Sequence, residues 1–76
     1  MALSDIVKHN GKYYRIESLL IEDYGYKTLV FPCKRNGNVT SYWDLYCETY
    51  ATESTMKLRH MQIVDDIKTG RMIFND

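Results

Sequence analysis

Hydrophobic and polar residues alternate from residue 5 to residue 50, which is the pattern of half-buried β-strands. The alternating runs are rich in β-branched and aromatic residues, and short polar stretches with glycine separate them. The alternation predicts strands at residues 5–9, 12–21, 26–33 and 39–50. The last strand can break near Trp43-Asp44.

Two Asn-Gly steps, Asn10-Gly11 and Asn36-Gly37, predict hairpins between consecutive strands. In the favoured type I′ turn both central residues need positive φ, which asparagine and glycine tolerate best. The first turn sets Val7 opposite Tyr14. The second sets Cys33 opposite Thr40 and Cys47 opposite Tyr26. The polar stretch 22–25 predicts the third reversal.

After Thr52 the period of the pattern changes to that of a helix. Thr52 is a suitable N-cap, and Gly70 lies where a left-handed C-cap belongs. These signals predict a helix over residues 53–69. One apolar stripe contains Met56, His60, Ile63, Val64 and Ile67.

These elements predict an α+β domain over residues 1–76, with a three- to four-stranded antiparallel meander sheet and one C-terminal helix packed on one face. Residues 71–74 fit a further short strand. Because one helix covers only one face, the second apolar face is either closed over by curling of the sheet or covered by a partner. The alternation assigns to one face Val7, Tyr14, Ile16, Leu20, Leu29, Phe31, Tyr42 and Tyr46. It assigns to the other face Ile6, Leu19, Ile21, Val30, Trp43 and Leu45.

Ten acidic and ten basic residues balance, so no overall field attracts the chain to nucleic acid or to anionic lipid. No stretch approaches the roughly 20 apolar residues of a membrane span. The first ten residues lack the apolar core of a secretory signal. We therefore expect a cytoplasmic protein without a membrane partner.

The potential metal ligands lack the close pairing that a structural zinc site needs, so we expect no metal. These ligands are His9, Cys33, Cys47 and His60. The predicted hairpin register separates the two cysteines by about seven residues along the strands, which is too far for a disulfide, so we expect both to be reduced. Glycines occur singly, so no phosphate-binding loop or other cofactor site is expected.

His60 is the most interesting candidate for chemistry, because it lies within the apolar stripe of the predicted helix. It is either a general base or ligand, or a partly buried imidazole that hydrogen-bonds a strand backbone or a tyrosine hydroxyl. Cys47, Ser41 and Thr49 lack a nucleophile motif, so we expect no catalytic residues and no enzyme.

A protein-binding surface is the positive function that the pattern favours, because interface cores are enriched in aromatic residues. The candidate residues are Trp43, Tyr42, Tyr46, Leu19 and Val30. Two other functions fit the sequence. The protein is either a homodimeric structural or virion component or a protein that binds single-stranded nucleic acid. The latter would use tyrosine rings together with Lys34, Arg35, Lys57 and Arg59.

The run Lys27-Thr28-Leu29-Val30-Phe31, the Asn36-Gly37 turn, the Tyr50-Ala51-Thr52-Glu53 helix start and His60 together resemble a group of small uncharacterised tailed-bacteriophage proteins. The chain departs from their pattern at Lys27, where an acid is common, and at Ser54-Thr55-Met56, where glutamate and alanine are usual. The resemblance implies a phage source and action in the host cytoplasm. Since small phage proteins without catalytic motifs often occupy a host protein, it implies binding to a host or phage protein, which can inhibit that protein.

Overall fold

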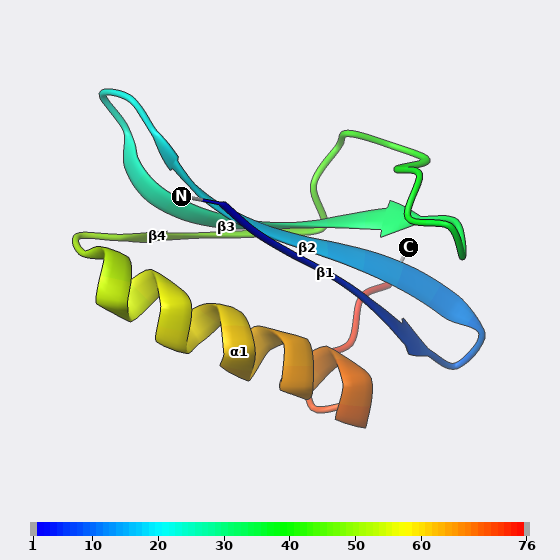
Figure 1. The fold of residues 1–76 in the computed structure, drawn as a ribbon. Coiled ribbons are helices and arrows are strands. Elements are labelled where there is room, and N and C mark those ends of the chain that lie inside the picture. The colour runs from blue at the N-terminus through cyan, green and yellow to red at the C-terminus, as the bar shows by residue number, and fades with distance from the viewer. Residues whose placement is uncertain (1, 76) are drawn as a thin grey trace.

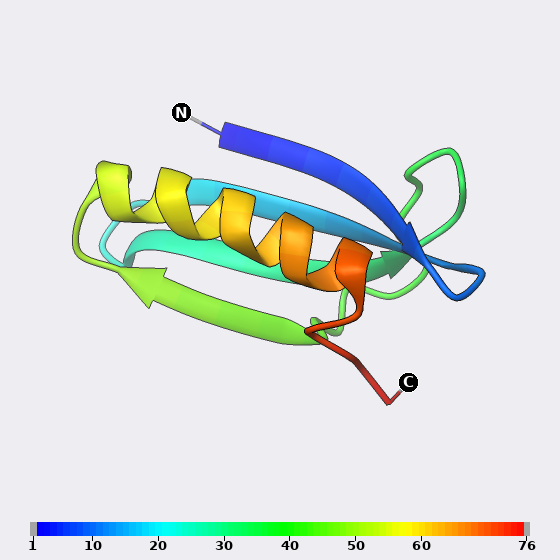
Figure 2. The same ribbon diagram turned by 90° about the horizontal axis from the view of Figure 1, so that it is seen from below.

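The computed structural model describes residues 2–75 and shows a four-stranded antiparallel sheet in the order β1-β2-β3-β4, with one C-terminal helix (Figure 1). The predicted α+β fold is confirmed. Seen from the helix side, α1 lies along the sheet between the two edge strands, β1 and β4 (Figure 2). The elements are β1 (Ala2–His9), β2 (Lys12–Ile21), β3 (Gly25–Cys33), β4 (Tyr46–Tyr50) and α1 (Glu53–Thr69).

The first Asn-Gly turn forms as predicted. Asn10 and Gly11 have φ of 50° and 78°, and the register sets Val7 opposite Tyr14. The reversal between β2 and β3 also lies where it was predicted. Asp23 and Gly25 adopt positive φ there.

The second Asn-Gly turn differs from the prediction. Gly37 has a φ of 89°, Asn36 does not have positive φ, and the Gly37 amide donates to the Lys34 carbonyl at 2.8 Å. This is a type I turn followed by a left-handed glycine, which adds one residue to the loop. Cys33 consequently pairs with Val39 rather than Thr40.

After this pair the chain leaves the sheet and returns only at Tyr46, so β4 is much shorter than predicted. The longer loop also shifts the register, and Cys47 lies opposite Leu29 rather than Tyr26.

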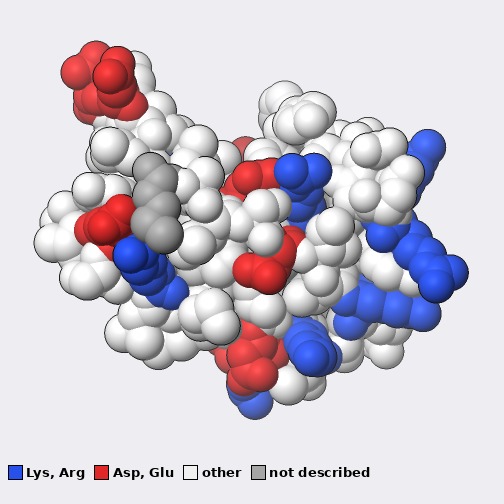
Figure 3. Space-filling model, viewed as in Figure 1, with Lys and Arg blue, Asp and Glu red and all other residues white. Residues whose placement is uncertain are grey.

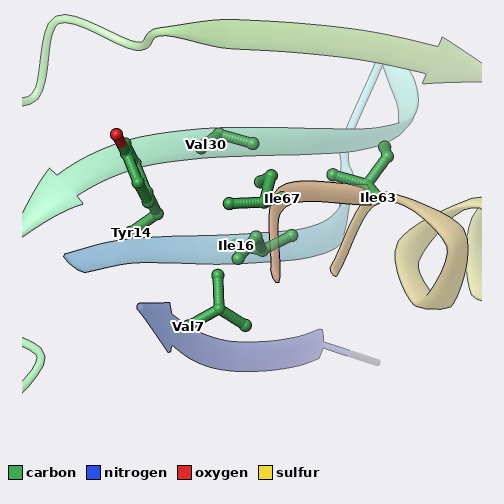
Figure 4. Close-up of a cluster of buried hydrophobic side chains, with 6 residues drawn as sticks. All are labelled: Val7, Tyr14, Ile16, Val30, Ile63 and Ile67. Carbon is green, nitrogen blue, oxygen red and sulfur yellow. The ribbon is translucent and has the colours of Figure 1, made fainter. Parts of the chain in front are cut away.

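The core lies between α1 and one face of the sheet, and its buried cluster comprises Val7, Tyr14, Ile16, Val30, Ile63 and Ile67 (Figure 4). Val30 pairs with Ile16 and is 0% exposed, so its assignment to the face away from the helix is wrong. Leu29 and Phe31 accordingly point to that opposite face. The prediction misplaced β3 by one residue relative to β2, and a shift of one residue inverts every side chain of a strand.

Two further face assignments are corrected because residues 40–45 are not part of a strand. Leu45 packs against the core cluster on the helix side. Tyr42 lies instead on the opposite side, where its ring contacts Phe31 at a centroid distance of 5.5 Å.

The helix has the predicted bounds and caps. The Thr52 hydroxyl accepts from the Thr55 amide at 3.3 Å, and Gly70 closes the last turn with a φ of 81°. Beyond α1, residues 71–75 form no strand. Met72 and Phe74 instead fold back against the core cluster.

The second face of the sheet is covered only in part, by the loop of residues 34–45, which folds back over one end of it (Figure 1). Beneath this loop Phe31 and Cys33 are buried, and the Arg15 guanidinium donates to the Gly37 carbonyl at 3.0 Å. We call the remainder of this side the open face. The sheet itself stays open, with β1 and β4 as separate edges.

Candidate functional site

Two large aromatic side chains stand in solvent on the 34–45 loop. Trp43 is 88% exposed and Tyr42 is 79% exposed. Local contacts hold the loop, because the Thr40 amide donates to the Pro32 carbonyl at 3.0 Å and the Trp43 amide donates to the Ser41 hydroxyl at 3.2 Å. The exposed rings are therefore attached to an ordered backbone rather than to a free coil.

A strip of half-buried aliphatic residues lies on the open face, formed by Leu19, Ile21 and Leu29. Leu29 is two residues from Phe31, against which the Tyr42 ring packs, so the strip is continuous with the aromatic loop. We call the two together the aromatic surface, defined as Leu19, Ile21, Leu29, Tyr42 and Trp43.

The five predicted interface residues do not all lie on this surface. Leu19, Tyr42 and Trp43 share it, whereas Val30 is buried beneath α1. Tyr46 also faces α1, where it packs against the core and its hydroxyl donates to Glu48. Val30 is therefore not available to a partner, and the partly buried Tyr46 lies on the side of the sheet away from the aromatic surface.

A chain of polar side chains crosses the interior between α1 and the sheet. His60 is 0% exposed, and its two ring nitrogens contact Asp5 Oδ2 at 2.7 Å and Ser18 Oγ at 2.6 Å. Ser18 Oγ lies 2.6 Å from Thr28 Oγ1 in turn. Of the two interpretations of His60, the hydrogen-bonded buried imidazole agrees with this geometry, with Ser18 and Asp5 as its partners.

The order Asp5, His60, Ser18 is that of an acyl-transfer triad, but this serine cannot meet a substrate. Ser18 is 0% exposed and its hydroxyl is shared with Thr28. A hollow of about 350 Å³ reaches Asp5 between β1 and α1, and Ser18 does not line it. The chain of hydrogen bonds therefore ends inside the core, and we interpret it as structural.

A second polar cluster joins β4 to α1. Arg59 donates to both carboxylate oxygens of Glu48, at 2.6 and 3.1 Å. These bonds, with the one from Tyr46, lower the pKa of Glu48 to about 2, and the same carboxylate raises the pKa of Arg59. Tyr50 lies beside this cluster, and burial raises the pKa of its phenol.

The four basic residues proposed from the sequence for nucleic acid do not gather. Arg59 is engaged with Glu48, and Lys57 lies 3.8 Å from Glu53 on the same helix. Lys34 and Arg35 are exposed in the turn that follows β3. Only Lys34 and Arg35 therefore lie next to each other at one end of the sheet.

Both cysteines are free thiols, Cys33 buried and Cys47 exposed, and burial raises the pKa of Cys33. Within residues 2–75, histidine, cysteine and carboxylate side chains nowhere form a group of three that could hold a metal. No helix in that range is long and apolar enough to cross a membrane.

Sequence reasoning missed the residues that hold His60, namely Asp5, Ser18 and Thr28. A weak signal existed, because Ser18 and Thr28 are small polar residues within apolar strands and His60 interrupts an apolar helix stripe. Their convergence depends on strand register, which the sequence did not fix.

The fold and these surfaces define a small α+β protein in which an open antiparallel meander is covered by one helix and displays an aromatic loop. Comparison with protein-family models, curated proteins and solved structures found no match.

Proposed function

We propose that this protein is a non-enzymatic binding protein that docks on a host or phage protein in the cytoplasm through its aromatic surface. The observation that carries the proposal is Trp43, which is 88% exposed and follows the 79% exposed Tyr42. Tryptophan and tyrosine are the residues most enriched at interface hot spots.

The loop geometry supports binding rather than incidental exposure. Hydrogen bonds from Thr40 and Trp43 fix the backbone, and the Tyr42 ring rests on Phe31. A surface that is already ordered loses less conformational entropy when a partner binds. The neighbouring aliphatic strip adds apolar area that no element of residues 2–75 covers fully.

Catalysis is not part of the proposal, because Ser18 in the Ser18–His60–Asp5 chain is buried and does not line the hollow that reaches Asp5. Occupying a site on the partner is then the simplest way for the protein to act, and it inhibits a partner whose own function needs that site.

The test is affinity capture from a host lysate with the tagged wild-type protein, with the captured proteins identified by mass spectrometry. The same capture is then repeated with the Trp43→Ala variant. Tyr24→Ala is the matched control, since Tyr24 is a 72% exposed aromatic residue in the β2–β3 turn, outside the aromatic surface. We expect the same protein to be recovered by wild type and by Tyr24→Ala, and to be lost with Trp43→Ala. Equal recovery by all three would refute the proposal.

The mass in solution tests the homodimer alternative. We expect a monomer mass by light scattering for wild type and for Trp43→Ala. A doubled mass that reverts to the monomer in Trp43→Ala would mean that a second copy occupies the aromatic surface, and it would contradict binding of a host protein there.

A further inference from the structure

The cations of this neutral chain are distributed unevenly along the sequence. Residues 6–16 and 24–43 contain no aspartate or glutamate. These two segments nevertheless hold six of the ten lysines and arginines, namely Lys8, Lys12, Arg15, Lys27, Lys34 and Arg35.

The fold brings most of these cations to one end of the sheet. Tyr13 pairs with Lys8 on one side and with Cys33 on the other, so the β1–β2 turn and the end of β3 lie side by side. Gly37 folds back against Ile6, because a Cβ built on this glycine would lie 2.5 Å from Ile6 Cδ1. The turn that holds Lys34 and Arg35 therefore lies over β1.

The last turn of α1 adds a fifth cation, since Lys68 lines the same hollow as Lys8. We call this region the basic end, defined as Lys8, Lys12, Lys34, Arg35 and Lys68. Figure 3 shows lysine and arginine gathered where β3 and β1 end, while acidic side chains cover the opposite β2–β3 hairpin.

Four of the five cations of the basic end carry charges that no acid within residues 2–75 holds in an ion pair, namely Lys8, Lys34, Arg35 and Lys68. Lys8 instead rests over the Tyr13 ring, 5.5 Å from its centroid. By contrast, Arg59 and Arg71 are each held by carboxylates. The local potential is therefore positive although the formal net charge is zero.

We infer that the basic end binds single-stranded nucleic acid, with phosphates on its lysines and Arg35 and with unpaired bases stacked on the exposed rings of the 34–45 loop. Several unneutralised cations beside exposed aromatic rings are the combination that single-strand binding uses. The exposed rings favour nucleic acid over an acidic protein segment, because every unpaired base offers a face for stacking. This inference rests on the cations together with the exposed rings, and oligonucleotide binding can be measured without the proposed protein partner.

The test is fluorescence anisotropy of a labelled oligothymidylate of about 15 nucleotides, a length within the range of single-strand sites. We expect binding at low salt whose affinity falls as salt rises, with a log–log slope of about −2 to −3 if three or four phosphates are contacted. Emission from Trp43, the single tryptophan, should be quenched on binding.

The Lys34→Glu/Arg35→Glu variant should bind about tenfold or more weakly and show a shallower salt slope, because two phosphate contacts are lost. The Lys27→Glu/Lys57→Glu variant is the matched control. It changes the net charge equally, but neither residue belongs to the basic end, and it should bind more tightly than the first variant. Both variants change partly or fully exposed residues, and circular dichroism checks that they fold.

Three outcomes would overturn the inference. These are no anisotropy change at low salt, equal weakening by the two double variants, and displacement of the oligonucleotide by polyglutamate as effectively, charge for charge, as by unlabelled oligothymidylate. The last outcome would assign the basic end to an acidic protein segment. None of them affects the Trp43→Ala capture experiment, so the two proposals fail separately.

Discussion

Ser18 shows at the scale of one residue how the interior keeps its polar groups satisfied. Its hydroxyl lies 2.6 Å from both His60 Nδ1 and Thr28 Oγ1. With a neutral imidazole whose Nε2 donates to the Asp5 carboxylate, Nδ1 accepts from Ser18 and Ser18 accepts from Thr28. Each N–H or O–H donor in this chain of hydrogen bonds then has a defined acceptor. Removing one member leaves its neighbours buried without a partner.

Ser18→Ala should therefore lower the free energy of unfolding by about 1–3 kcal/mol, the cost of unsatisfied buried polar groups. Urea denaturation at neutral pH measures the effect. Ser4→Ala is the control, because Ser4 is exposed on β1, and it should change stability by less than about 0.5 kcal/mol. Equal midpoints for the two variants would show that the chain adds no stability.

The Glu48–Arg59 pair gives a residue-scale prediction for pH. The pKa of Glu48 falls from 4.5 to about 2 on folding, so its contribution to stability is present above pH 4.5 and is lost as pH falls toward 2. Since the pair is partly exposed, we expect that contribution to be roughly 1–3 kcal/mol. Acid titration of the unfolding free energy should show the loss in wild type.

In Glu48→Gln this part of the acid dependence should be absent, and stability at pH 7 should already be reduced. Glu53→Gln is the control, because its partner Lys57 is an exposed i,i+4 neighbour at 3.8 Å and such pairs contribute only about 0.3–0.5 kcal/mol. Parallel acid profiles for wild type and Glu48→Gln would contradict the assigned role.

At the scale of elements, the same dipeptide forms two different turns. Asn10-Gly11 closes a tight hairpin in which every residue of β1 pairs with β2. Asn36-Gly37 instead lies at the tip of a loop that folds back over the sheet, where Arg15 bonds the Gly37 carbonyl. Contacts with residues remote in sequence therefore changed the second turn.

This difference predicts unequal costs for two glycine substitutions. Gly11→Ala meets no atom within 4 Å, so only its φ of 78° is strained, at about 1–2 kcal/mol. Gly37→Ala has similar strain and also places a Cβ against Ile6, so it should lower the melting temperature further. Thermal denaturation compares them. A smaller loss for Gly37→Ala would mean that the loop does not press on β1.

At the scale of the whole molecule, one helix cannot cover both faces of a four-stranded sheet. The 34–45 loop shields one end of the second face and leaves the aromatic surface and the basic end on the outside. The core and the aromatic surface thus lie on opposite sides of the sheet, so substitutions in the two places should affect stability and partner binding separately.

Ile63→Ala, on the buried side, should lower the free energy of unfolding by about 2–5 kcal/mol, because it removes a core side chain that is 0% exposed. Trp43→Ala should change it by less than about 0.5 kcal/mol, since the indole is in solvent. Chemical denaturation measures both. A large loss of stability for Trp43→Ala would make the tryptophan a structural residue and would remove the basis of the proposed interface.

The sequence by itself determined the features that depend on residues close together along the chain. The turn at Asn10-Gly11, the register of β1 with β2 and the helix between the Thr52 and Gly70 caps were all predicted, because backbone dihedrals and capping hydrogen bonds are local. The exposed Trp43 and Tyr42 were named as candidates from their type alone.

Only the tertiary structure decided the rest. It decided which side chains of β3 face α1, and so buried Val30, and it decided the register of β4 against β3. Both depend on loops whose shape is set by contacts across the sheet. His60 is 55 residues from Asp5 and 42 from Ser18, and the cations of the basic end come from three separate strands and turns and from α1. Such groups meet only when the strands are aligned, and a one-residue change in alignment would separate them.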